Sequence, residues 1–430
     1  MAKLQIALDF VNLPRALKAA RAAVAGGADI LEAGTPLIKS CGLEAVRALR
    51  AEFKDIPIVA DMKIMDTGRA EVEIAAKAGA GIVTVCSSAG VATVRECVEA
   101  GLNYGAEIMI DFIGVSEVSE IEKFLGLSVN YLGIHISIDE QMRGSGGGSL
   151  LDELVSRTNI PVVIAGGINS ETAASYASRG AGTVIVGGAI TKAKNPEEET
   201  KKIKQALKEN IAIPSEYFVR VDEKNIKSVL RKVSAANMSD ALHRGLPLKG
   251  IKPVTAGKKM AGRALTVRTY PGDWAKPVEA IDVASEGDIL VIDAGGGSGG
   301  APAVWGELAT HSAIQKGLGG IVISGAVRDT ADIKKMNLPV FSSAVTPQAG
   351  EPKGFGEIGV PGVISGVRIK KGDWIIGDDD GVVVIPKEKA AEFTNRAMDV
   401  LERENRIREE IKEGSTLASV AQLLMWEKQK

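Results

Sequence analysis

The chain has 430 residues, of which 45% are hydrophobic and 25% are charged, and its formal net charge is −2. This balance is typical of a globular protein, and the length favours two or more domains over one. No run of like charges dominates the sequence, so it gives no sign of a nucleic acid or an anionic membrane as a partner. We therefore expect small-molecule partners.

The N-terminus and the cysteines bear on the compartment. The stretch from Met1 to Asp9 lacks the long apolar region of a secretory signal, and no stretch approaches the roughly 18 apolar residues of a membrane span. Cys41, Cys86 and Cys97 form no CxxC motif and no even set of disulfide partners, so we expect buried structural thiols. These features favour a cytoplasmic protein.

Short apolar runs alternate with amphipathic stretches from Lys3 to about Asn210. The predicted strands are Leu4 to Asp9, Asp29 to Glu32, Pro57 to Asp61, Gly81 to Val85, Ala106 to Phe112, Asn130 to His135, Pro161 to Ala165 and Gly182 to Val186. Helices separate them, and a last one is expected from Asn195 to Glu209. Eight strand–helix units in roughly 200 residues predict a parallel (β/α)8 TIM barrel, with an open doubly wound sheet as the alternative.

The pattern changes after the charged helix that begins at Asn195, which Ile213-Pro214 interrupts. We place the barrel at residues 1–210, a linker at 211–224, a second domain at 225–385 and a helical tail at 386–430. The tail carries Ala391, Phe393, Ala397, Val400 and Leu401 on one helix face, which predicts packing on its own domain or on a neighbouring subunit.

The second domain combines short strands with few helices. The expected elements are strands at Gly262 to Tyr270, Asp288 to Asp293, Gly320 to Ile323 and Val340 to Phe341, a helix at Val304 to Lys316, a hairpin at Trp374 to Ile385 and a glycine-rich loop at Gly295 to Gly300. This mixture predicts a compact α/β sandwich and not a second barrel.

Polar side chains end several predicted barrel strands, where such barrels keep their active sites. These residues are Asp9 after the first strand, Glu32 after the second, Asp61 after the third and His135 after the sixth. Strand alternation puts Asp61 and Lys63 on the same side, and Asp66 opens the next segment. Buried charges without partners are costly, so this cluster favours a catalytic site. An ion-pair network that closes the barrel mouth is the structural alternative.

The carboxylates suit a hard divalent cation such as Mg²⁺, which would keep positions for substrate oxygens. Lys63 should stay protonated between them and stabilise an oxyanion. The metal would polarise the carbonyl of a sugar phosphate.

Glycine pairs follow the seventh and eighth strands, at Gly166-Gly167 and Gly187-Gly188. Glycines let backbone N–H groups approach an anion, and barrels often bind phosphate after these two strands. Each pair alone is more often a tight turn. Two pairs beside a charged mouth favour a phosphate site.

The motif Asp61-x-Lys63-x-x-Asp66 resembles the orotidine 5'-phosphate decarboxylase suprafamily. Within it, Leu8-Asp9, Glu32-Ala33-Gly34-Thr35 and His135 followed by Asp139-Glu140-Gln141 resemble 3-hexulose-6-phosphate synthase and its relative 3-keto-L-gulonate-6-phosphate decarboxylase, over about residues 1–210. The resemblance implies Mg²⁺, or alternatively Mn²⁺, on Glu32 and Asp61. It also implies catalytic roles for Lys63, Asp66, His135 and Asp9, and phosphate on the glycine loops. Family dimers build the site across the interface, so Asp66 would serve the partner's substrate.

Two positions separate the branches of this family. The decarboxylases carry arginines where this chain has Ile138 and Gly188, which favours the synthase. The implied reaction is the reversible aldol addition of formaldehyde to D-ribulose 5-phosphate, giving D-arabino-hex-3-ulose 6-phosphate. The decarboxylase is the alternative, and the sequence does not decide the direction of the aldol reaction.

A second cluster is predicted in the other domain. Gly306-Glu307-Leu308 begins a helix, and Arg328-Asp329 follows 21 positions after Glu307. Free N–H groups at a helix start, beside an arginine, suit a carboxylate such as that of pyruvate, and Asp329 could hold a metal over the same ligand. A surface Arg-Asp pair beside a capped helix is the structural alternative.

With Trp305, Gly325-Ala326-Val327 and Asp378-Asp379-Asp380-Gly381, these residues resemble the family that unites class II pyruvate aldolases with the ribonuclease E activity regulator. The resemblance implies Mg²⁺ on Asp329, a metal-bound water on Glu307, and a 2-oxo acid bound by Gly306, Glu307, Leu308 and Arg328. It also implies a trimer or hexamer in which Asp240 completes a neighbour's site. Asp332 favours the aldolase, and a non-catalytic regulatory or oligomerisation module is the alternative.

Overall fold

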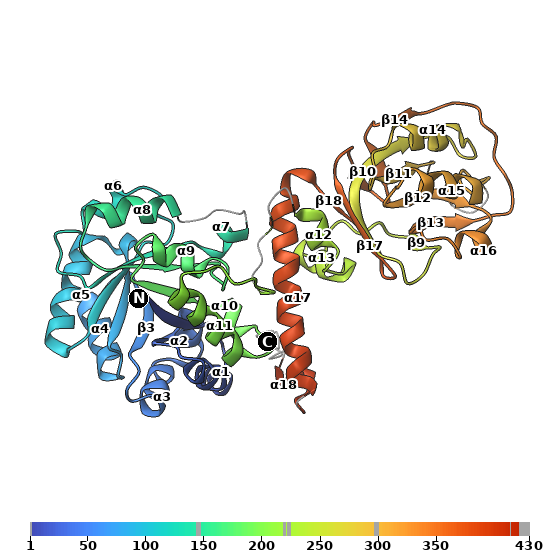
Figure 1. Ribbon diagram of the computed structural model, residues 1–430. Coiled ribbons are helices and arrows are strands. Elements are labelled where there is room, and N and C mark those ends of the chain that lie inside the picture. Colours follow the sequence, from blue (N-terminus) through green and yellow to red (C-terminus); the bar gives the residue numbers. More distant parts are fainter. Residues whose placement is uncertain are drawn as a thin grey trace, which may run out of the picture. The chain divides into compact units, whose positions relative to one another are not determined.

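The computed structural model describes residues 2–142, 148–217, 221, 225–295, 301–412 and 414–420 (Figure 1). The chain divides into two compact units, Met1–Arg220 with Glu402–Lys430, and Val221–Leu401. The predicted linker, the glycine-rich loop after Gly295 and the end of the predicted tail lie partly outside the described residues. Among the described helices, none is both long and apolar enough to cross a membrane.

The first unit contains a closed barrel of parallel strands, each paired with the next and the last with the first. The strands are β1 (Lys3–Leu8), β2 (Ile30–Ala33), β3 (Ile58–Ile64), β4 (Ile82–Cys86), β5 (Glu107–Asp111), β6 (Tyr131–His135), β7 (Val162–Ala165) and β8 (Thr183–Val186). The prediction of a (β/α)8 barrel is confirmed, and the open doubly wound sheet is excluded.

Helices surround the barrel (Figure 1). They are α1 (Leu13–Ala25), α2 (Thr35–Cys41), α3 (Glu44–Glu52), α4 (Gly68–Lys77), α5 (Gly90–Tyr104), α6 (Ser119–Glu122), α7 (Ile138–Met142), α8 (Gly148–Arg157), α9 (Ala173–Ser178), α10 (Gly188–Thr191) and α11 (Pro196–Glu209). The helix predicted from Asn195 is confirmed as α11. The Asn195 side chain accepts a hydrogen bond from the Glu198 N–H, and the first turn is rich in glutamate, so the local sequence fixes where the helix begins.

Strand alternation separates two apolar clusters in the barrel. Leu4, Ile6 and Leu8 of β1 belong to the large cluster shared with the helices. A smaller cluster contains Ile30, Val59, Ile82, Met109 and Val163. Since successive side chains on a strand face opposite sides, this second cluster fills the barrel interior. Residues two positions further along β2, β3 and β5 face the same interior, and they are all acidic: Glu32, Asp61 and Asp111.

The second unit is built on a mixed sheet of order β18-β17-β10-β11-β12-β13-β9, with β14 paired to β10. Its strands are β9 (Lys252–Pro253), β10 (Met260–Arg268), β11 (Ile289–Asp293), β12 (Gly320–Val327), β13 (Val340–Val345), β14 (Glu357–Ile358), β17 (Trp374–Asp378) and β18 (Gly381–Ile385), and β15 (Gly362–Ile364) pairs with β16 (Val367–Ile369). Its helices are α12 (Ile226–Leu230), α13 (Ala235–Ala241), α14 (Ala275–Val283), α15 (Glu307–Gln315) and α16 (Thr330–Ile333). The predicted α/β character and the hairpin are confirmed.

Among the element boundaries that differ from those predicted, two position the site of this unit. The helix expected from Val304 begins at Glu307, because the Val304 N–H donates to the Ala326 carbonyl and Trp305 forms a β-bridge with Val327. For the same reason β12 extends beyond Ile323 to Val327. Arg328 and Asp329 therefore follow directly after a strand, beside the start of α15.

The predicted tail forms α17 (Ala390–Lys412) and α18 (Leu417–Val420). Ala397 is buried in the apolar cluster of the second unit, with Phe393 and Leu401 packed against it. Ala391 and Val400 are only half-buried, so the predicted face was partly wrong. Two polar residues, Thr394 and Asn395, are fully buried on this helix, and the Asn395 side chain accepts a hydrogen bond from the backbone N–H of Val221.

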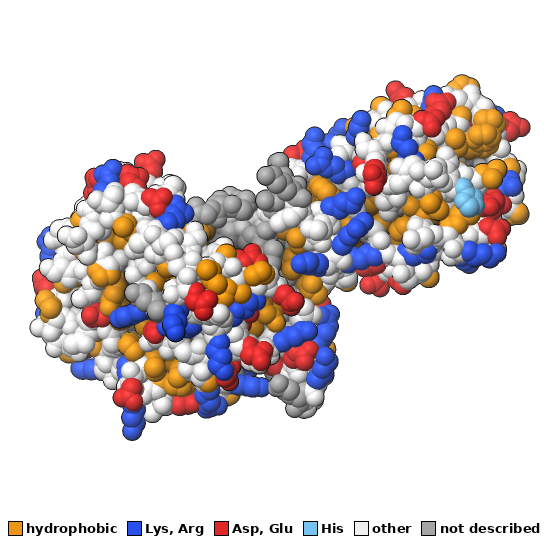
Figure 2. All heavy atoms as spheres, viewed as in Figure 1, with side chains coloured by type: hydrophobic (Ala, Val, Ile, Leu, Met, Phe, Trp, Pro, Cys, Tyr) orange, Lys and Arg blue, Asp and Glu red, His pale blue; other side chains and the backbone are white. Residues whose placement is uncertain are grey.

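The surface agrees with the near-zero net charge. Figure 2 shows acidic and basic side chains interspersed over the face of the barrel unit that it presents. Cys86 and Cys97 are buried, and burial raises the pKa of their thiols to about 11 and about 12. Cys41 is half-exposed, so the expectation of three buried thiols was wrong for this residue.

Candidate active site

The end of β3 carries a backbone irregularity that directs Lys63. The pairing of β3 with β4 shifts register between Ala60 and Ile64, and Lys63 has a φ of 47°. The Lys63 N–H donates to Oγ1 of Thr84 over 3.1 Å. Left-handed backbone at a non-glycine residue is uncommon and often found at functional sites. Lys63 and Asp61 do meet as predicted, but through this irregularity and not through simple strand alternation.

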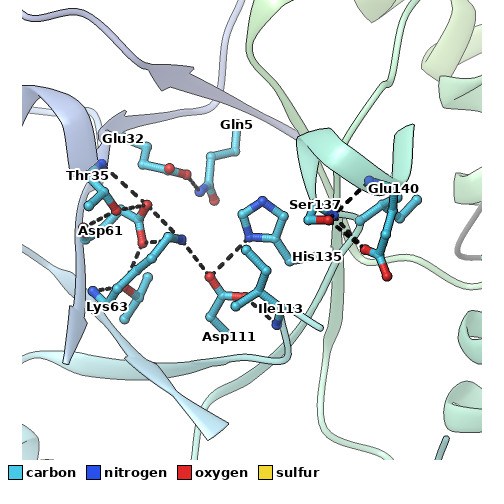
Figure 3. Close-up of polar contacts among 12 residues, drawn as sticks. Gln5, Glu32, Thr35, Asp61, Lys63, Asp111, Ile113, His135, Ser137 and Glu140 are labelled. Atoms are coloured by element: carbon cyan, nitrogen blue, oxygen red, sulfur yellow. Dashed lines mark hydrogen bonds and ion pairs between the residues drawn. The ribbon is translucent and has the colours of Figure 1, made fainter. Parts of the chain in front are cut away.

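The Lys63 ammonium lies between two carboxylates. Its Nζ is 3.1 Å from Oδ2 of Asp61 and 2.7 Å from Oδ2 of Asp111, and these contacts are drawn in Figure 3. Burial by itself lowers the pKa of Lys63, but Asp61 and Asp111 outweigh it, and the net effect is a raised pKa. Lys63 is therefore a protonated hydrogen-bond donor at neutral pH, as expected from the sequence.

Asp111 also binds His135, so that one carboxylate links the lysine to the imidazole. Oδ2 of Asp111 lies 3.0 Å from Nδ1 of His135. Burial tends to raise the pKa of Asp111, but the hydrogen bond and charge of His135, with the charge of Lys63, lower it to about 2. The sequence analysis missed Asp111. The available signal was its place at the end of the fifth predicted strand, like that of Asp61 at the end of the third.

Glu32 and Asp61 stand on neighbouring strands, and both are buried. Asp61 accepts hydrogen bonds from the hydroxyls of Thr35 over 2.6 Å and Thr84 over 2.8 Å. Glu32 accepts one from the side-chain amide of Gln5. Burial raises the pKa of Glu32 well above its usual value, and the charges of Asp61 and Asp9 raise it further. The interior end of the barrel therefore gathers carboxylates that repel one another.

Asp9 reaches solvent at the mouth but is recessed among protein atoms. Burial and the charge of Asp61 raise its pKa. A Cβ at Gly34 would lie 2.2 Å from Oδ1 of Asp9, and one at Gly187 would lie 3.6 Å from Oδ2. The glycines after β2 and β8 thus leave the space that the Asp9 side chain occupies, which joins the predicted phosphate loop to the acidic cluster.

Mutual repulsion of Glu32, Asp61 and Asp9 is the condition that a bound divalent cation relieves, and buried carboxylate oxygens are the ligands that Mg²⁺ prefers. Within the described residues, no group of three or more acidic, histidine or cysteine side chains is arranged to hold a metal by itself. Mg²⁺ commonly uses one or two carboxylates and takes its other ligands from water and substrate. Glu32 and Asp61 fit that donor set.

The two glycine pairs lie next to each other at the mouth, because β7 and β8 pair in parallel with Ala165 opposite Ile185. Gly166 and Gly167 both have positive φ, which favours glycine at each position. A Cβ at Gly166 would lie 2.3 Å from the Ile136 carbonyl oxygen, so the loop passes close to the end of β6. The side chains of Ile138 and Asp139 lie outside the described residues.

Asp66 does not join the Lys63 cluster in this chain. It is exposed, its Oδ1 accepts the Thr67 N–H over 2.7 Å, and it lines an open groove with Arg69, Arg95 and residues of α4 and α5. The role expected for Asp66 in a partner's site stays a prediction.

The second unit brings together four of the residues predicted for its site. Oδ2 of Asp329 accepts the Glu307 N–H over 3.2 Å, and Oδ1 of Asp329 lies 3.2 Å from Nε of Arg328. A Cβ at Gly306 would lie 2.6 Å from Oδ2 of Asp329, so glycine permits this approach. One N–H group of the helix start is therefore already taken, because Asp329 accepts the hydrogen bond from Glu307.

The side chains of Leu308 and Asp332 point elsewhere, and the role expected for Asp240 in a neighbour's site stays a prediction. Leu308 is 80% exposed, Asp332 pairs with Lys335 over 2.9 Å, and Asp240 is exposed on α13. Glu307 lies 3.3 Å from Nε2 of His311. The structure therefore places Gly306, Glu307, Arg328 and Asp329 in one cluster.

The fold and the polar cluster define the first unit as a (β/α)8-barrel protein with an enzyme-like site at the carboxyl ends of its strands. The chain belongs to the orotidine 5'-phosphate decarboxylase / HUMPS family, whose sequence model matches residues 2–203. Residues 235–384 match the Aldolase/RraA family, so the second unit is RraA-like. Both resemblances drawn from the sequence are confirmed at the level of the family.

Individual relatives match the barrel. A 3-hexulose-6-phosphate synthase of Bacillus subtilis is 34% identical over 207 residues, which cover 48% of this chain and 98% of the relative. An uncharacterized protein of Methanocaldococcus jannaschii is 40% identical over 197 residues, covering 46% of this chain and 93% of the relative. The solved structure of a 3-hexulose-6-phosphate synthase from Salmonella typhimurium is 34% identical, covers 48% of this chain and 99% of its own, and superposes with a TM-score of 0.47.

Proposed function

We propose that the barrel is a Mg²⁺-dependent aldehyde-lyase that condenses formaldehyde with D-ribulose 5-phosphate, reversibly, to D-arabino-hex-3-ulose 6-phosphate. The observation that carries the proposal is the chain of polar contacts from Asp61 through Lys63 and Asp111 to His135, in which both carboxylates are buried. It joins a permanent hydrogen-bond donor to an oriented imidazole. Relatives named 3-hexulose-6-phosphate synthase support the choice of substrates.

The reaction needs a proton removed from C1 of ribulose 5-phosphate, beside the C2 carbonyl. His135 is suited to this transfer, since Nδ1–H donation to Asp111 leaves Nε2 free to accept a proton. Lys63 then donates hydrogen bonds to the oxygen that gains charge as the enediolate forms. When C1 attacks formaldehyde, the new C–C bond leaves an alkoxide, and His135 returns the proton to that oxygen.

The remaining residues bind and orient the substrate. Asp9, at the mouth between Gly34 and Gly187, accepts hydrogen bonds from sugar hydroxyls. The backbone N–H groups of the loops at Gly166-Gly167 and Gly187-Gly188 hold the phosphate. Glu32 and Asp61 would hold Mg²⁺, with Mn²⁺ as the alternative ion, which supplies Lewis-acid stabilisation of the carbonyl oxygen when bound.

The test is an assay of ribulose 5-phosphate consumption with and without formaldehyde, in Mg²⁺, in Mn²⁺ and after chelation. We expect consumption that requires both formaldehyde and a divalent ion. Consumption without formaldehyde dependence, or none under any condition, would exclude the synthase. Release of CO₂ from 3-keto-L-gulonate 6-phosphate in the same preparation would establish the alternative decarboxylase.

For the second unit we propose a class II pyruvate aldolase or oxaloacetate decarboxylase, with Mg²⁺ on Asp329 and the 2-oxo acid on Arg328 and on the turn formed by Gly306, Glu307 and Leu308. The observation that favours it is the junction of Asp329, Arg328 and the start of α15. Metal-dependent pyruvate release from oxaloacetate should disappear in Arg328→Ala and persist in Arg368→Ala, whose side chain is exposed on β16. Silence of the unsubstituted chain over a panel of 2-oxo acids, with capture of a ribonuclease, would instead favour the non-catalytic regulatory module.

A further inference from the structure

The last described part of the chain returns to the barrel. Residues 402–412 and 414–420, which we call the C-terminal strap, comprise the end of α17 and all of α18, and they belong to the same compact unit as the barrel. A match of 207 residues already covers 98% of the Bacillus subtilis relative, so the strap has no counterpart there. It is an addition to a barrel that is otherwise complete.

One contact of the strap lies directly beside the mouth. The guanidinium carbon of Arg406 stands 4.6 Å from the ring centroid of Phe10, and Phe10 is only 6% exposed. Burial, followed by the charge of Arg15, lowers the pKa of Arg406, although an arginine stays charged at any physiological pH. A desolvated cation over an aromatic face interacts more strongly than an exposed one. Phe10 is the residue after Asp9.

A second set of strap contacts binds Arg15, near the start of α1. Oε1 of Glu410 accepts hydrogen bonds from Nη2 of Arg15 over 2.6 Å and from Nε of Arg406 over 3.0 Å. Nη1 of Arg15 donates to the carbonyl of Val420 over 3.1 Å, and α18 lies beside α1 in Figure 1. The side chains of Arg15, Arg406 and Glu410 are between 20% and 23% exposed, so solvent screens their charges less than those of surface pairs.

These contacts enclose a short turn that carries Asp9. The turn runs from the end of β1 at Leu8 to the start of α1 at Leu13, so Asp9 lies outside any strand or helix. Arg406 holds Phe10 on one side of the turn, and Glu410 with Val420 holds Arg15 on the other. The site of Asp9 is narrow, since a Cβ at Gly34 would lie 2.2 Å from Oδ1 of Asp9. A small shift of the turn therefore moves the Asp9 carboxylate relative to the rest of the mouth.

We infer that the C-terminal strap positions Asp9, and that Arg406, acting through Phe10, and Glu410, acting through Arg15, are positioning residues of the barrel site. The inference rests on the proposed function only for its kinetic consequence. If the inference holds, the strap affects substrate binding in the barrel. A helix that merely packs on the barrel surface would not.

The test uses the full chain with Arg406→Ala, and Arg408→Ala as its matched control. Arg408 is two positions away on the same helix, and its guanidinium donates to Glu404 and Asn405, which both belong to the strap. Hydrogen–deuterium exchange of residues 9–15 reports the turn itself, and steady-state kinetics report Asp9. Because Asp9 is assigned to substrate binding, Arg406→Ala should raise KM for ribulose 5-phosphate about fivefold with little change in kcat. General loss of folded protein would lower the apparent kcat instead.

Arg406→Ala should also speed exchange at residues 9–15, and Arg408→Ala should change neither measurement. Unchanged exchange in Arg406→Ala would overturn the inference, whatever the kinetics. Faster exchange with an unchanged KM in an active enzyme would show that the strap only packs on the turn, and this result would also overturn the inference. If the unsubstituted chain shows no aldol activity, the proposed function fails, and exchange alone decides whether the strap holds the turn.

A second variant keeps the inference testable if Arg406→Ala does not fold. Phe10→Leu fills the same space but removes the aromatic face. If Arg406 acts through Phe10, Phe10→Leu alone should raise KM to a similar extent, and adding Arg406→Ala should raise it little more. A KM for Phe10→Leu equal to that of the unsubstituted chain would overturn the inference.

Discussion

Lys63 and Asp111 are 48 residues apart in the sequence and lie on strands separated by β4, yet Nζ of Lys63 is 2.7 Å from Oδ2 of Asp111. The same oxygen of Asp111 contacts His135. One carboxylate thereby fixes both the group that donates to an oxyanion and the group that moves a proton. The predictions below follow from this arrangement and from the carboxylates beside it.

Replacement of Lys63 by alanine should abolish formaldehyde-dependent consumption of ribulose 5-phosphate, with a loss of about 1000-fold or more, because a preorganised donor to the developing oxyanion is removed. The fold should persist, as judged by circular dichroism. Lys77→Ala is a suitable control, since that lysine is exposed on α4 and pairs with Glu73. Unchanged turnover in Lys63→Ala would exclude the assigned role.

Asp111→Asn should lower stability in a pH-dependent way. The pKa of Asp111 is about 2 in the folded chain, against about 3.9 in unfolded chains, so folding favours the carboxylate. Its contribution, on the order of 2 kcal/mol, is complete above the unfolded pKa and is lost as the pH falls from about 4 towards 2. At pH 7, Asp111→Asn should therefore unfold at a clearly lower urea concentration than the unsubstituted chain.

The difference in free energy of unfolding between the unsubstituted chain and Asp111→Asn should decrease as the pH falls from 5 to 3. Asp152→Asn provides the control, because the Asp152–Arg179 pair lies at the surface and contributes little at any pH. A gap that stays constant over this range would show that the Asp111 carboxylate is not stabilised as described.

Glu32→Gln should separate metal binding from folding. In the unsubstituted chain, Mg²⁺ should raise the midpoint of thermal unfolding by a few degrees over the chelated protein, because a ligand of the folded state stabilises it. Glu32→Gln should lose this response. Without metal the variant should be no less stable, because it removes a carboxylate that burial and its neighbours disfavour. Calorimetry measures both effects, and Glu44→Gln on the surface should behave as the wild type.

A full response to Mg²⁺ in Glu32→Gln would place the cation elsewhere. A response absent from the unsubstituted chain as well would argue against a divalent ion in the barrel.

Gly34→Ala should reduce activity without unfolding the barrel. Gly34 has a φ of −63° and a ψ of 156°, which alanine adopts freely, so the backbone is not strained. The new Cβ would lie 2.2 Å from Oδ1 of Asp9 and must displace that side chain. A misplacement of about 1 Å in a site can reduce kcat/KM by about 100-fold. Gly126→Ala, where no atom lies within 4 Å of the new Cβ, should leave kcat/KM unchanged. Equal kinetics in the two variants would remove Asp9 from the site.

The sequence by itself determined the barrel and the family to which it belongs. Strand periodicity is a local property, so it identified every barrel strand and put Glu32 and Asp61 at the strand ends. The structure shows that both face the interior, two positions beyond Ile30 and Val59. The capping residue Asn195 fixed a helix start for the same local reason. The motifs that carried the family resemblance also lie at strand ends, where neighbouring residues suffice to reveal them.

Only the tertiary structure decided which side chains meet. The left-handed backbone at Lys63 depends on a register shift against β4, which periodicity along β3 does not contain. Asp66 lies three positions from Lys63 but outside its cluster, whereas Asp111 joins it from a distant strand. Arg15 binds the carbonyl of Val420 across 405 positions. Such contacts form because closure of the sheet and packing of helices bring remote segments together. The local sequence around each residue does not reveal which remote residue it will contact.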